Sequence, residues 1–398
     1  MNRKISLGWV ICAIFLTIAL TFLVSWQVSQ NEFNKNLTTS KLSDDVEKKV
    51  SEVEGIIKEH YIEDISESDL IDYAGSGLVY SIGDKYATYF TAEEFEKHLI
   101  ENSGKFTGIG ASIKNQDDGI LVTDVYENSP AKEAGVKIGD LIIKLGGKEV
   151  SSLTTTEIND AVKGEDGETF DFTVKRENEE IDFSVVRSQF DRVYVISRML
   201  DNKIGYIRIT EFEETTPEQF NKAYDALIKD GAKAFVFDVR NNAGGTVTSI
   251  CDVVDKLIPE GTIATAKFKD GTEKTLGTSN KEEMTLPSVI LANSNTASAA
   301  ELFCAALKDY NKAEIVGMNT FGKGVMQEYF RLSDGSAVKL TTAKYYTPKG
   351  ENYDGVGIKP DYEVKQSENE QLLIFGKNEA DDTQLQKAIE VISKKISK

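Results

Sequence analysis

A series of short apolar runs, alternating with longer amphipathic segments in the second half of the chain, restricts the fold more than any other feature. Three runs have the length of buried strands: Ile204–Ile209, Ala234–Val239 and Val289–Ala292. Pro217–Lys229 and Ala299–Tyr310 have a helix-like pattern. Strands that alternate with helices are typical of a sheet with helices packed on it. We therefore expect a mixed α/β domain over residues 189–366.

The N-terminus contains an apolar run that is long enough to cross a membrane. Arg3 and Lys4 precede an almost uncharged stretch from Leu7 to Val28, and roughly 20 apolar residues span a bilayer core. We interpret residues 1–30 as a cytoplasmic tip and an uncleaved transmembrane signal anchor. The expected location is the cell membrane, as a single-pass protein whose residues from about Asn31 onward are extracytoplasmic. The alternative, a cleaved signal peptide, also exports the rest of the chain.

Composition excludes several classes of function. The net charge of −19 argues against nucleic acid as a partner, because phosphate binding needs a basic surface. The three cysteines, Cys12, Cys251 and Cys304, form neither a disulfide framework nor paired zinc-ligand spacing. We predict no metal and no cofactor.

Residues 31–102 are expected to form a linker and an N-terminal helical domain. Leu42–Tyr61 has amphipathic spacing, a second helix runs from about Asp69 to near Gly83, and Thr91–Glu94 resembles a capping box that opens a third. At the other end, residues 367–398 form a predicted C-terminal helical segment. We expect both ends to serve packing or assembly, and a homodimer is one possibility that they leave open.

Residues 103–188 have the pattern of a small β-rich module. Its expected strands are Thr107–Ile113, Ile120–Val125, Leu141–Leu145, Phe170–Lys175 and Ile181–Val185. Ala131–Ala134 and Thr155–Val162 are expected to be helical. The module resembles a PDZ domain in two stretches: Phe106-Thr107-Gly108-Ile109-Gly110, which is similar to the carboxylate-binding loop, and the Ser129-Pro130-Ala131 stretch that ends in Gly139-Asp140.

The first of these stretches predicts the site that binds a peptide terminus. Gly108 and Gly110 let backbone N–H groups converge on a terminal carboxylate without interference from Cβ atoms. The strand that follows can pair with an added peptide. Ile109, Ala111 and Ile113 alternate onto one face of that strand and suit an apolar side chain. The predicted ligands are therefore proteins or peptides with apolar C-termini.

Ser298 stands where an expected strand, ending at Ala292, meets an expected helix. Such a junction exposes the hydroxyl group, and the free N–H groups of the helix N-terminus favour negative charge. The N–H of Ala299 is well placed to bind a developing oxyanion. The alternative for this segment alone is that Ser298 or Thr296 only caps the helix.

A serine nucleophile needs a base, and the two histidines of the chain, His60 and His98, lie far upstream. Lys323 is the better candidate, because Gly322 and Gly324 bracket it in an apolar loop and burial lowers the pKa of a lysine. Gln327 follows at a distance that lets its amide oxygen orient the amine. Taken alone, Lys323 would be better explained as a surface lysine in a turn.

A glycine-rich loop follows the run that ends in Val239. The backbone amides of Gly244 or Gly245 are candidates for a second oxyanion donor, and a plain turn is the alternative. The loop lacks the glycine spacing of a dinucleotide-binding motif.

Together these segments resemble the carboxyl-terminal processing proteases, also called tail-specific proteases. Three motifs carry the resemblance: Asp238-Val239-Arg240-Asn241-Asn242-x-Gly244-Gly245, Ala297-Ser298-Ala299-x-Glu301 and Phe321-Gly322-Lys323-Gly324-x-x-Gln327. The resemblance implies that Ser298 is the nucleophile, Lys323 the general base and Gln327 its orienter. It also implies a PDZ domain that recognises apolar C-terminal tails and can gate the site. Lys163, where some relatives carry an arginine, leaves the details of gating open.

We therefore expect an α/β multidomain serine endopeptidase with an N-terminal helical region, a PDZ domain, a mixed α/β protease core and one transmembrane helix. A regulatory adaptor is a further partner that the sequence leaves open. Two alternatives are a non-catalytic PDZ scaffold that binds C-terminal tails and a serine/lysine amidase that acts on small molecules or cell-wall peptides. The PDZ module argues against the amidase.

Overall fold

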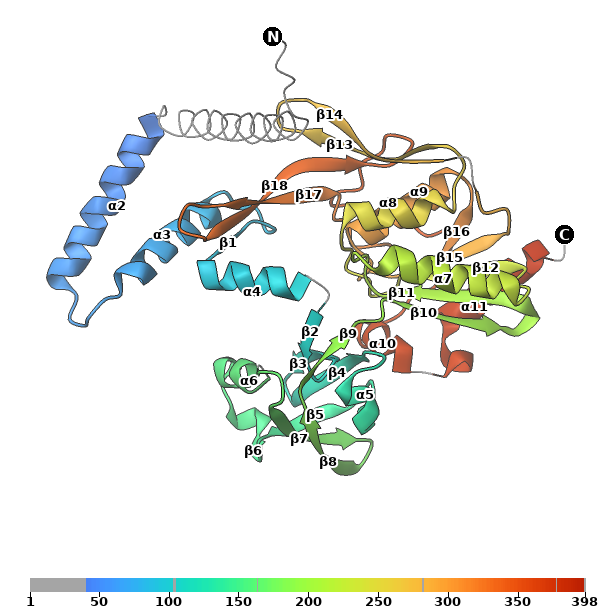
Figure 1. Ribbon diagram of the computed structural model, residues 1–398, viewed down its shortest axis with the longest axis horizontal. Coiled ribbons are helices and arrows are strands. Elements are labelled where there is room, and N and C mark those ends of the chain that lie inside the picture. The colour runs from blue at the N-terminus through green and yellow to red at the C-terminus, as the bar shows by residue number, and fades with distance from the viewer. Residues whose placement is uncertain (1–40, 103–104, 163, 281–282, 377, 397–398) are drawn as a thin grey trace, which may run out of the picture. The chain divides into compact units, whose positions relative to one another are not determined.

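The computed structural model describes residues 41–102, 105–162, 164–280, 283–376 and 378–396 (Figure 1). The predicted membrane anchor, Leu7–Val28, lies outside these residues. Within the described ranges, no helix combines the length and the apolar character that crossing a bilayer requires. The chain folds into two compact units that divide between Gly83 and Asp84.

The described part of the first unit, residues 41–83, contains two helices, α2 (Lys41–His60) and α3 (Glu67–Ser81), and both confirm the predicted helical pattern. Lys58 of α2 pairs with Glu54 at 2.9 Å and with Glu67 of α3 at 2.7 Å. Several large apolar side chains of the two helices are exposed, among them Ile71 and Tyr73.

The protease core of the second unit is built on a six-stranded sheet with the order β10-β11-β12-β15-β16-β19. Its strands are β10 (Val195–Leu200), β11 (Ile204–Ile209), β12 (Ala234–Asp238), β15 (Ser288–Ala292), β16 (Ala313–Gly317) and β19 (Tyr362–Glu363). Strand β10 is antiparallel to β11, and all other neighbours are parallel. The three predicted apolar runs are β11, β12 and β15, so the predicted sheet is confirmed.

Helices cover both faces of this sheet (Figure 1). They are α7 (Thr216–Lys229), α8 (Val247–Asp255), α9 (Ala299–Asp309) and α11 (Thr383–Ile396). Side chains alternate across a strand, and β12 shows the result. Phe235 and Phe237 pack into the cluster that includes α7, α8 and α9, whereas Val236 packs into the cluster that includes α11. The predicted terminal helix is thus part of the core.

A second, five-stranded antiparallel sheet was not predicted from the sequence. Its strands are β1 (Thr88–Phe90), β13 (Gly261–Phe268), β14 (Glu273–Ser279), β17 (Val325–Arg331) and β18 (Ala337–Tyr346). Tyr89 of β1 lies opposite Val338 of β18, so the segment before the PDZ domain pairs with a strand far beyond it. Helix α4 (Ala92–Asn102) follows β1, and reciprocal hydrogen bonds between Thr91 and Glu94 confirm the predicted capping box.

The PDZ domain is a β-sheet of six strands flanked by short helices. Its strands are β3 (Ala111–Gln116), β4 (Gly119–Val125), β5 (Leu141–Leu145), β6 (Lys148–Glu149), β7 (Thr169–Arg176) and β8 (Glu179–Val186). Its helices are α5 (Pro130–Ala134), η1 (Val150–Ser152) and α6 (Thr155–Val162). Two strands, β2 (Lys105–Gly108) and β9 (Ser188–Asp191), pair with each other at the entry and exit of the domain.

The prediction of one continuous strand over Thr107–Ile113 was wrong, because the chain divides there between β2 and β3. Gly110 has φ +79, and a Cβ atom at this residue would lie 2.2 Å from Ser129 Cβ. A residue with positive φ ends the strand, and only glycine fits against Ser129. The other predicted strands and helices of the PDZ domain are confirmed.

Four short helices complete the second unit: η2 (Asp201–Lys203), α10 (Glu368–Leu372), η3 (Ile374–Gly376) and η4 (Glu379–Asp381).

Candidate active site

Ser298 lies at the turn between β15 and α9, as the sequence predicts. It has φ 54 and ψ −120, a strained combination for a residue with a Cβ atom. A strained serine between a strand and a helix is the arrangement that presents a nucleophilic hydroxyl in α/β-hydrolases. The turn before it is held by Thr296, whose hydroxyl donates to the carbonyl of Val239 at 2.8 Å and accepts from Asn293 N–H at 3.0 Å.

The glycine-rich loop after β12 lies directly against Ser298. Gly244 has φ +114, and a Cβ atom there would lie 2.9 Å from Ser298 Cβ and 3.1 Å from the amide nitrogen of Ala299. The N–H of Gly244 donates to Oδ1 of Asn242 at 2.8 Å. The structure therefore brings Gly244, Ser298 and Ala299 together, with the Gly244 amide already engaged by the Asn242 side chain.

Glu301, one turn into α9, joins the Ser298 turn to the Lys323 loop. Its side chain is fully buried, and Oε2 accepts the N–H groups of Ser298 at 2.9 Å and Lys323 at 2.8 Å. Oε1 accepts the hydroxyl of Thr320 at 2.5 Å and the N–H of Gly322 at 2.7 Å. Burial raises the pKa of this carboxyl, while the four hydrogen bonds act to lower it. Glu301 was predicted only as part of a motif, although an acid at the third position of a helix is a known capping signal.

Lys323 lies in the loop before β17, between two glycines whose small size the backbone requires. A Cβ atom at Gly322 would lie 2.9 Å from the amide nitrogen of Gly357, and one at Gly324 would lie 2.5 Å from that of Asp354. The predicted close approach of backbone segments at these glycines is confirmed.

The environment of the Lys323 amine disfavours its charge. Burial lowers the pKa of Lys323 from its ordinary value, and the nearby positive charge of Lys339 lowers it further, against opposing effects of Asp84 and Glu301. The Nζ atom also lies 4.9 Å from the centre of the Tyr86 ring, a contact that favours the charged form. The net effect is a lowered pKa, which is what a lysine base requires.

The side chains of the three predicted catalytic residues are not joined in this conformation. Within the described ranges, the Lys323 amine shares no hydrogen bond with the Ser298 hydroxyl or with Gln327. Gln327 lies in β17, and its Nε2 donates to Thr341 at 3.1 Å. Among other side chains considered as bases, His98 pairs with the hydroxyl of Tyr329 at 2.7 Å.

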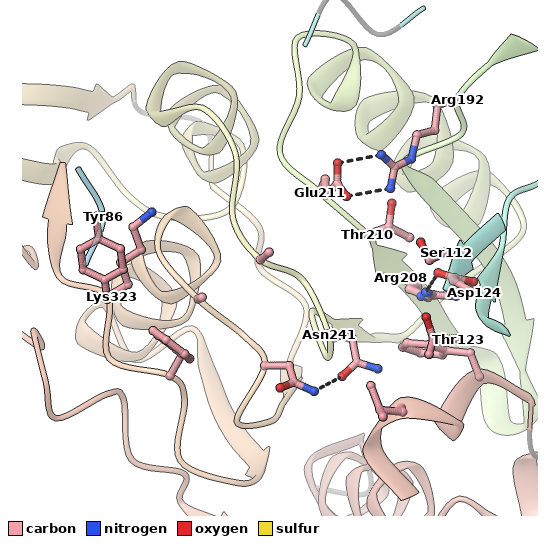
Figure 2. A pocket seen from close by; sticks show the side chains of 16 residues that line it. Tyr86, Ser112, Thr123, Asp124, Arg192, Arg208, Thr210, Glu211, Asn241 and Lys323 are labelled. Atoms are coloured by element: carbon pink, nitrogen blue, oxygen red, sulfur yellow. Dashed lines mark hydrogen bonds and ion pairs between the residues drawn. The ribbon is translucent and has the colours of Figure 1, made fainter. Parts of the chain in front are cut away.

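A cavity of about 490 Å³ opens beside these loops (Figure 2). Figure 2 shows Lys323 and Tyr86 on one wall. The facing wall carries an ion pair between Arg208 of β11 and Asp124 of the PDZ strand β4, at 2.6 Å. A second pair, Arg192 with Glu211 at 2.7 Å, lies on the same wall. The PDZ domain thus supplies part of the cavity lining.

Beneath the glycine-rich loop is a buried charge cluster that the sequence analysis missed. Arg240 is 1% exposed and pairs with Asp238 at 2.5 Å and with Asp382, at the start of α11, at 2.8 Å. Burial acts to lower the pKa of Arg240, but the two aspartates raise it well above its ordinary value. Because Arg240 and Asp382 are 142 residues apart, no local pattern could indicate this pair.

The predicted peptide-binding residues lie together in the PDZ domain. Gly108 ends β2, Ile109 and Gly110 form the connection, and Ile113 lies in β3. The carbonyl of Ile109 accepts the N–H of Ala131 at 2.7 Å, which ties this connection to α5. Ile109, Ala111 and Ile113 are half-buried against the PDZ core, so their predicted alternation onto one face is confirmed. Lys163 lies outside the described residues.

Three parts of the chain match known protein families. Residues 203–364 match Peptidase family S41, residues 107–186 match the PDZ domain, and residues 12–94 match the N-terminal domain of the activating protease CtpB.

Curated relatives extend the match over most of the chain. Carboxy-terminal processing protease CtpA of Bacillus subtilis is 33% identical over 362 residues, which cover 90% of this chain and 77% of the relative. A Staphylococcus aureus protein whose name describes it as a CtpA-like serine protease is 35% identical, and the match covers 79% of this chain and 64% of the relative. Among solved structures, the photosystem II D1 C-terminal processing protease has a TM-score of 0.55 at 24% identity, with coverage of 80% of this chain and 89% of that one.

Proposed function

The chain belongs to peptidase family S41 as a serine-type carboxyl-terminal processing protease, and on this premise we propose that Ser298 is its nucleophile and Lys323 its general base. The observation that carries the proposal is the buried carboxylate of Glu301, which binds the backbone N–H groups of both residues. It holds the Ser298 turn against the Lys323 loop.

In the proposed reaction, the neutral amine of Lys323 takes the proton of the Ser298 hydroxyl as the serine oxygen attacks the scissile carbonyl. The protonated amine then gives that proton to the leaving amine, and an acyl-enzyme remains. Water attacks the acyl group as its proton passes to Lys323, and the C–O bond to Ser298 then breaks as Lys323 gives that proton to the serine oxygen. The lowered pKa of Lys323 supports the first step, because only the uncharged amine can accept a proton.

The oxyanion that forms during attack is proposed to bind the N–H groups of Ala299 and of the loop at Gly244 and Gly245. Ala299 is the first residue of α9, where N–H groups have no partner inside the helix. Because the Gly244 N–H donates to Asn242 in this conformation, Gly245 is the loop amide that needs no rearrangement of that side chain. Gln327 is proposed to orient the amine through its Oε1 atom, since Nε2 is engaged by Thr341.

The PDZ domain is proposed to select substrates by their apolar C-terminal tails and to gate the site. The half-buried apolar row at Ile109, Ala111 and Ile113 supports tail binding, because β3 can accept an added strand. The Asp124–Arg208 ion pair supports gating, since movement of the PDZ domain would open or close the wall that faces Lys323.

Two further proposals rest on the sequence alone. The apolar run Leu7–Val28 is proposed to anchor the protein in the cell membrane with the catalytic domain outside the cytoplasm. A second copy of the chain is a proposed partner, because the helical parts could form a homodimer. A regulatory adaptor is also proposed.

The test is cleavage of an unstructured protein that ends in an apolar tail. Wild type is expected to cleave it, whereas Ser298→Ala and Lys323→Ala are expected to lose activity by at least about a thousandfold. Amidation of the tail is expected to raise KM, because the PDZ loop loses its carboxylate ligand. Equal cleavage by all three proteins would refute the proposed dyad, and tail binding without turnover by wild type would favour the non-catalytic scaffold.

A further inference from the structure

The residues after β19 form a short segment that reaches the catalytic loops from another part of the chain. This linking segment, Ser367–Gly376, comprises α10 and η3. Its central residue, Gln371, is 4% exposed. A buried side-chain amide is costly unless it is hydrogen-bonded, so the partners of Gln371 are informative.

Gln371 binds both loops that flank the nucleophile. Its side-chain Oε1 accepts two hydrogen bonds from Ser294, from the N–H at 3.2 Å and from the hydroxyl at 2.7 Å. Its backbone carbonyl accepts a third bond from Nδ2 of Asn241 at 2.7 Å. Ser294 belongs to the turn that leads to Ser298, and Asn241 belongs to the loop that leads to Gly244.

Asn241 and the Ser294 turn also contact each other directly. Oδ1 of Asn241 accepts from Nδ2 of Asn293 at 2.8 Å and from Nδ2 of Asn295 at 3.0 Å. The N–H of Asn241 donates to Oδ1 of Asn293 at 3.0 Å. Gln371 therefore completes a polar network that fixes the turn of the nucleophile relative to the loop of the proposed oxyanion donors.

The linking segment also contacts the PDZ domain. Glu368 forms an ion pair with Lys114 of β3, and a Cβ atom at Gly376 would lie 3.1 Å from Ile138 Cγ2. The ring of Phe375 lies 3.3 Å from the guanidinium carbon of Arg208, which pairs with Asp124 of the PDZ domain. One segment thus touches the PDZ domain at both ends and the catalytic loops at its centre.

We propose that Gln371 is a positioning residue for the protease reaction, an inference that rests on the proposed function of Ser298. It sets the Ser294 turn against the Asn241 loop, so that the hydroxyl and the oxyanion-binding amides meet at the same substrate carbonyl. Reaction rates depend steeply on such placement. Because Gln371 acts through these loops, its loss lowers kcat and leaves KM unchanged.

The test compares substitutions that differ in one acceptor atom. Gln371→Met removes the acceptor at a similar volume, Gln371→Glu keeps an acceptor oxygen, and Gln386→Met is the control at an exposed glutamine of α11. We measure kcat and KM with a tailed protein substrate and the rate at which a small fluorophosphonate modifies Ser298, which needs no PDZ domain. Each value is corrected for the folded fraction from thermal unfolding.

Gln371→Met is expected to lower kcat and the modification rate about tenfold or more with KM unchanged, whereas Gln371→Glu recovers most of the loss and Gln386→Met has no effect. Ser294→Ala removes one of the two donors and is expected to have a smaller effect that does not add to that of Gln371→Met. If Gln371→Met fails to fold, the kcat and the modification rate of Ser294→Ala test the inference instead. Wild-type rates per folded molecule in Gln371→Met, or full additivity with Ser294→Ala, would overturn the inference.

The modification rates distinguish a wrong nucleophile from a wrong role of Gln371. If the fluorophosphonate modifies wild type and Ser298→Ala equally, the proposed nucleophile is wrong. If it modifies wild type at Ser298 and Gln371→Met at the same rate, the nucleophile stands and only the role of Gln371 is wrong.

Discussion

The backbone N–H of Ser298 donates a 2.9 Å hydrogen bond to the carboxylate of Glu301. The same carboxylate accepts the N–H of Lys323 at 2.8 Å, so one buried side chain determines how far apart the two proposed catalytic residues can lie. The arrangement is rigid because all the acceptor positions face donors from three elements: the Ser298 turn, Thr320 and the Gly322–Lys323 loop.

Glu301→Gln is expected to damage both the fold and the proposed site. An amide nitrogen would face N–H donors where an oxygen now accepts them, which costs about 3 kcal/mol of unfolding free energy. We expect kcat/KM to fall by about a hundredfold or more, since the Lys323 loop loses its anchor. Urea unfolding and peptide cleavage measure the two effects, with the exposed Glu328→Gln as control. Unchanged kcat/KM in Glu301→Gln would contradict this role.

The activity is expected to rise with pH as Lys323 loses its proton. Because burial lowers the pKa of Lys323 from 10.5, the midpoint of the acidic limb of kcat/KM should lie below that value. Lys323→Arg keeps the charge but cannot act as a base at any accessible pH, so it should lose the acidic limb together with at least about a thousandfold of the activity. A Lys323→Arg enzyme with the wild-type pH profile would show that another group is the base.

Gly244→Ala is expected to lower the activity strongly for steric reasons. The new Cβ atom would lie 2.9 Å from Ser298 Cβ. Gly271→Ala is a matched control, because Gly271 also has positive φ, at +87, but no atom lies within 4 Å of its Cβ position. Both variants should lose about 1 kcal/mol of stability from backbone strain, and only Gly244→Ala should lose about a hundredfold or more in kcat. Equal activity of the two variants would contradict the proposed role of the contact between Gly244 and Ser298.

Asp382→Asn is expected to lower the unfolding free energy by about 3 kcal/mol, because it removes one of the two charges that neutralise the buried Arg240. Asp381→Asn, at the exposed neighbouring residue, should change it by less than about 0.5 kcal/mol. Urea unfolding of both variants measures the difference. Similar midpoints would mean that Arg240 is stabilised by Asp238 alone.

Glu213 gives the stability a dependence on pH near neutrality. Burial and the neighbouring charge of Glu211 raise its pKa from 4.5 to about 7. Between these values the folded state holds a proton that the unfolded state has lost, so this residue makes the protein less stable as the pH rises toward 7. Glu213→Gln should therefore add about 1 kcal/mol of stability at pH 8, after allowance for its partial exposure, and little at pH 4.5. The exposed Glu214→Gln should add nothing at either pH, and equal gains in the two variants would contradict the assignment.

The fold around Ser298, the proposed nucleophile, could be predicted because its signals are local. The apolar run of β15, the polar turn and the helix at Ala299 follow one another directly in the sequence, and the structure confirms each of them. The family predicted from the motifs is confirmed by the comparisons. The antiparallel sheet was missed because its strands are only partly buried, as in β18, and lack a continuous apolar run.

The network around the site could not be predicted, because its members are distant in sequence. Gln371 contacts Ser294 from 77 residues away, and no spacing rule connects an isolated glutamine to a turn. The approach of Gly244 to Ser298 depends on the parallel pairing of β12 with β15, which places the two loops at the same edge of the sheet. The motifs contain the residues that meet there, but the pairing of the strands in the sheet sets the distances between these residues.

The pairing of Arg240 with Asp382 has a consequence for biosynthesis. A ribosome completes the loop that carries Arg240 well before it adds α11, so during that interval the guanidinium has only one of its two counter-charges. The growing chain can therefore complete this buried charge cluster only after α11 has left the exit tunnel.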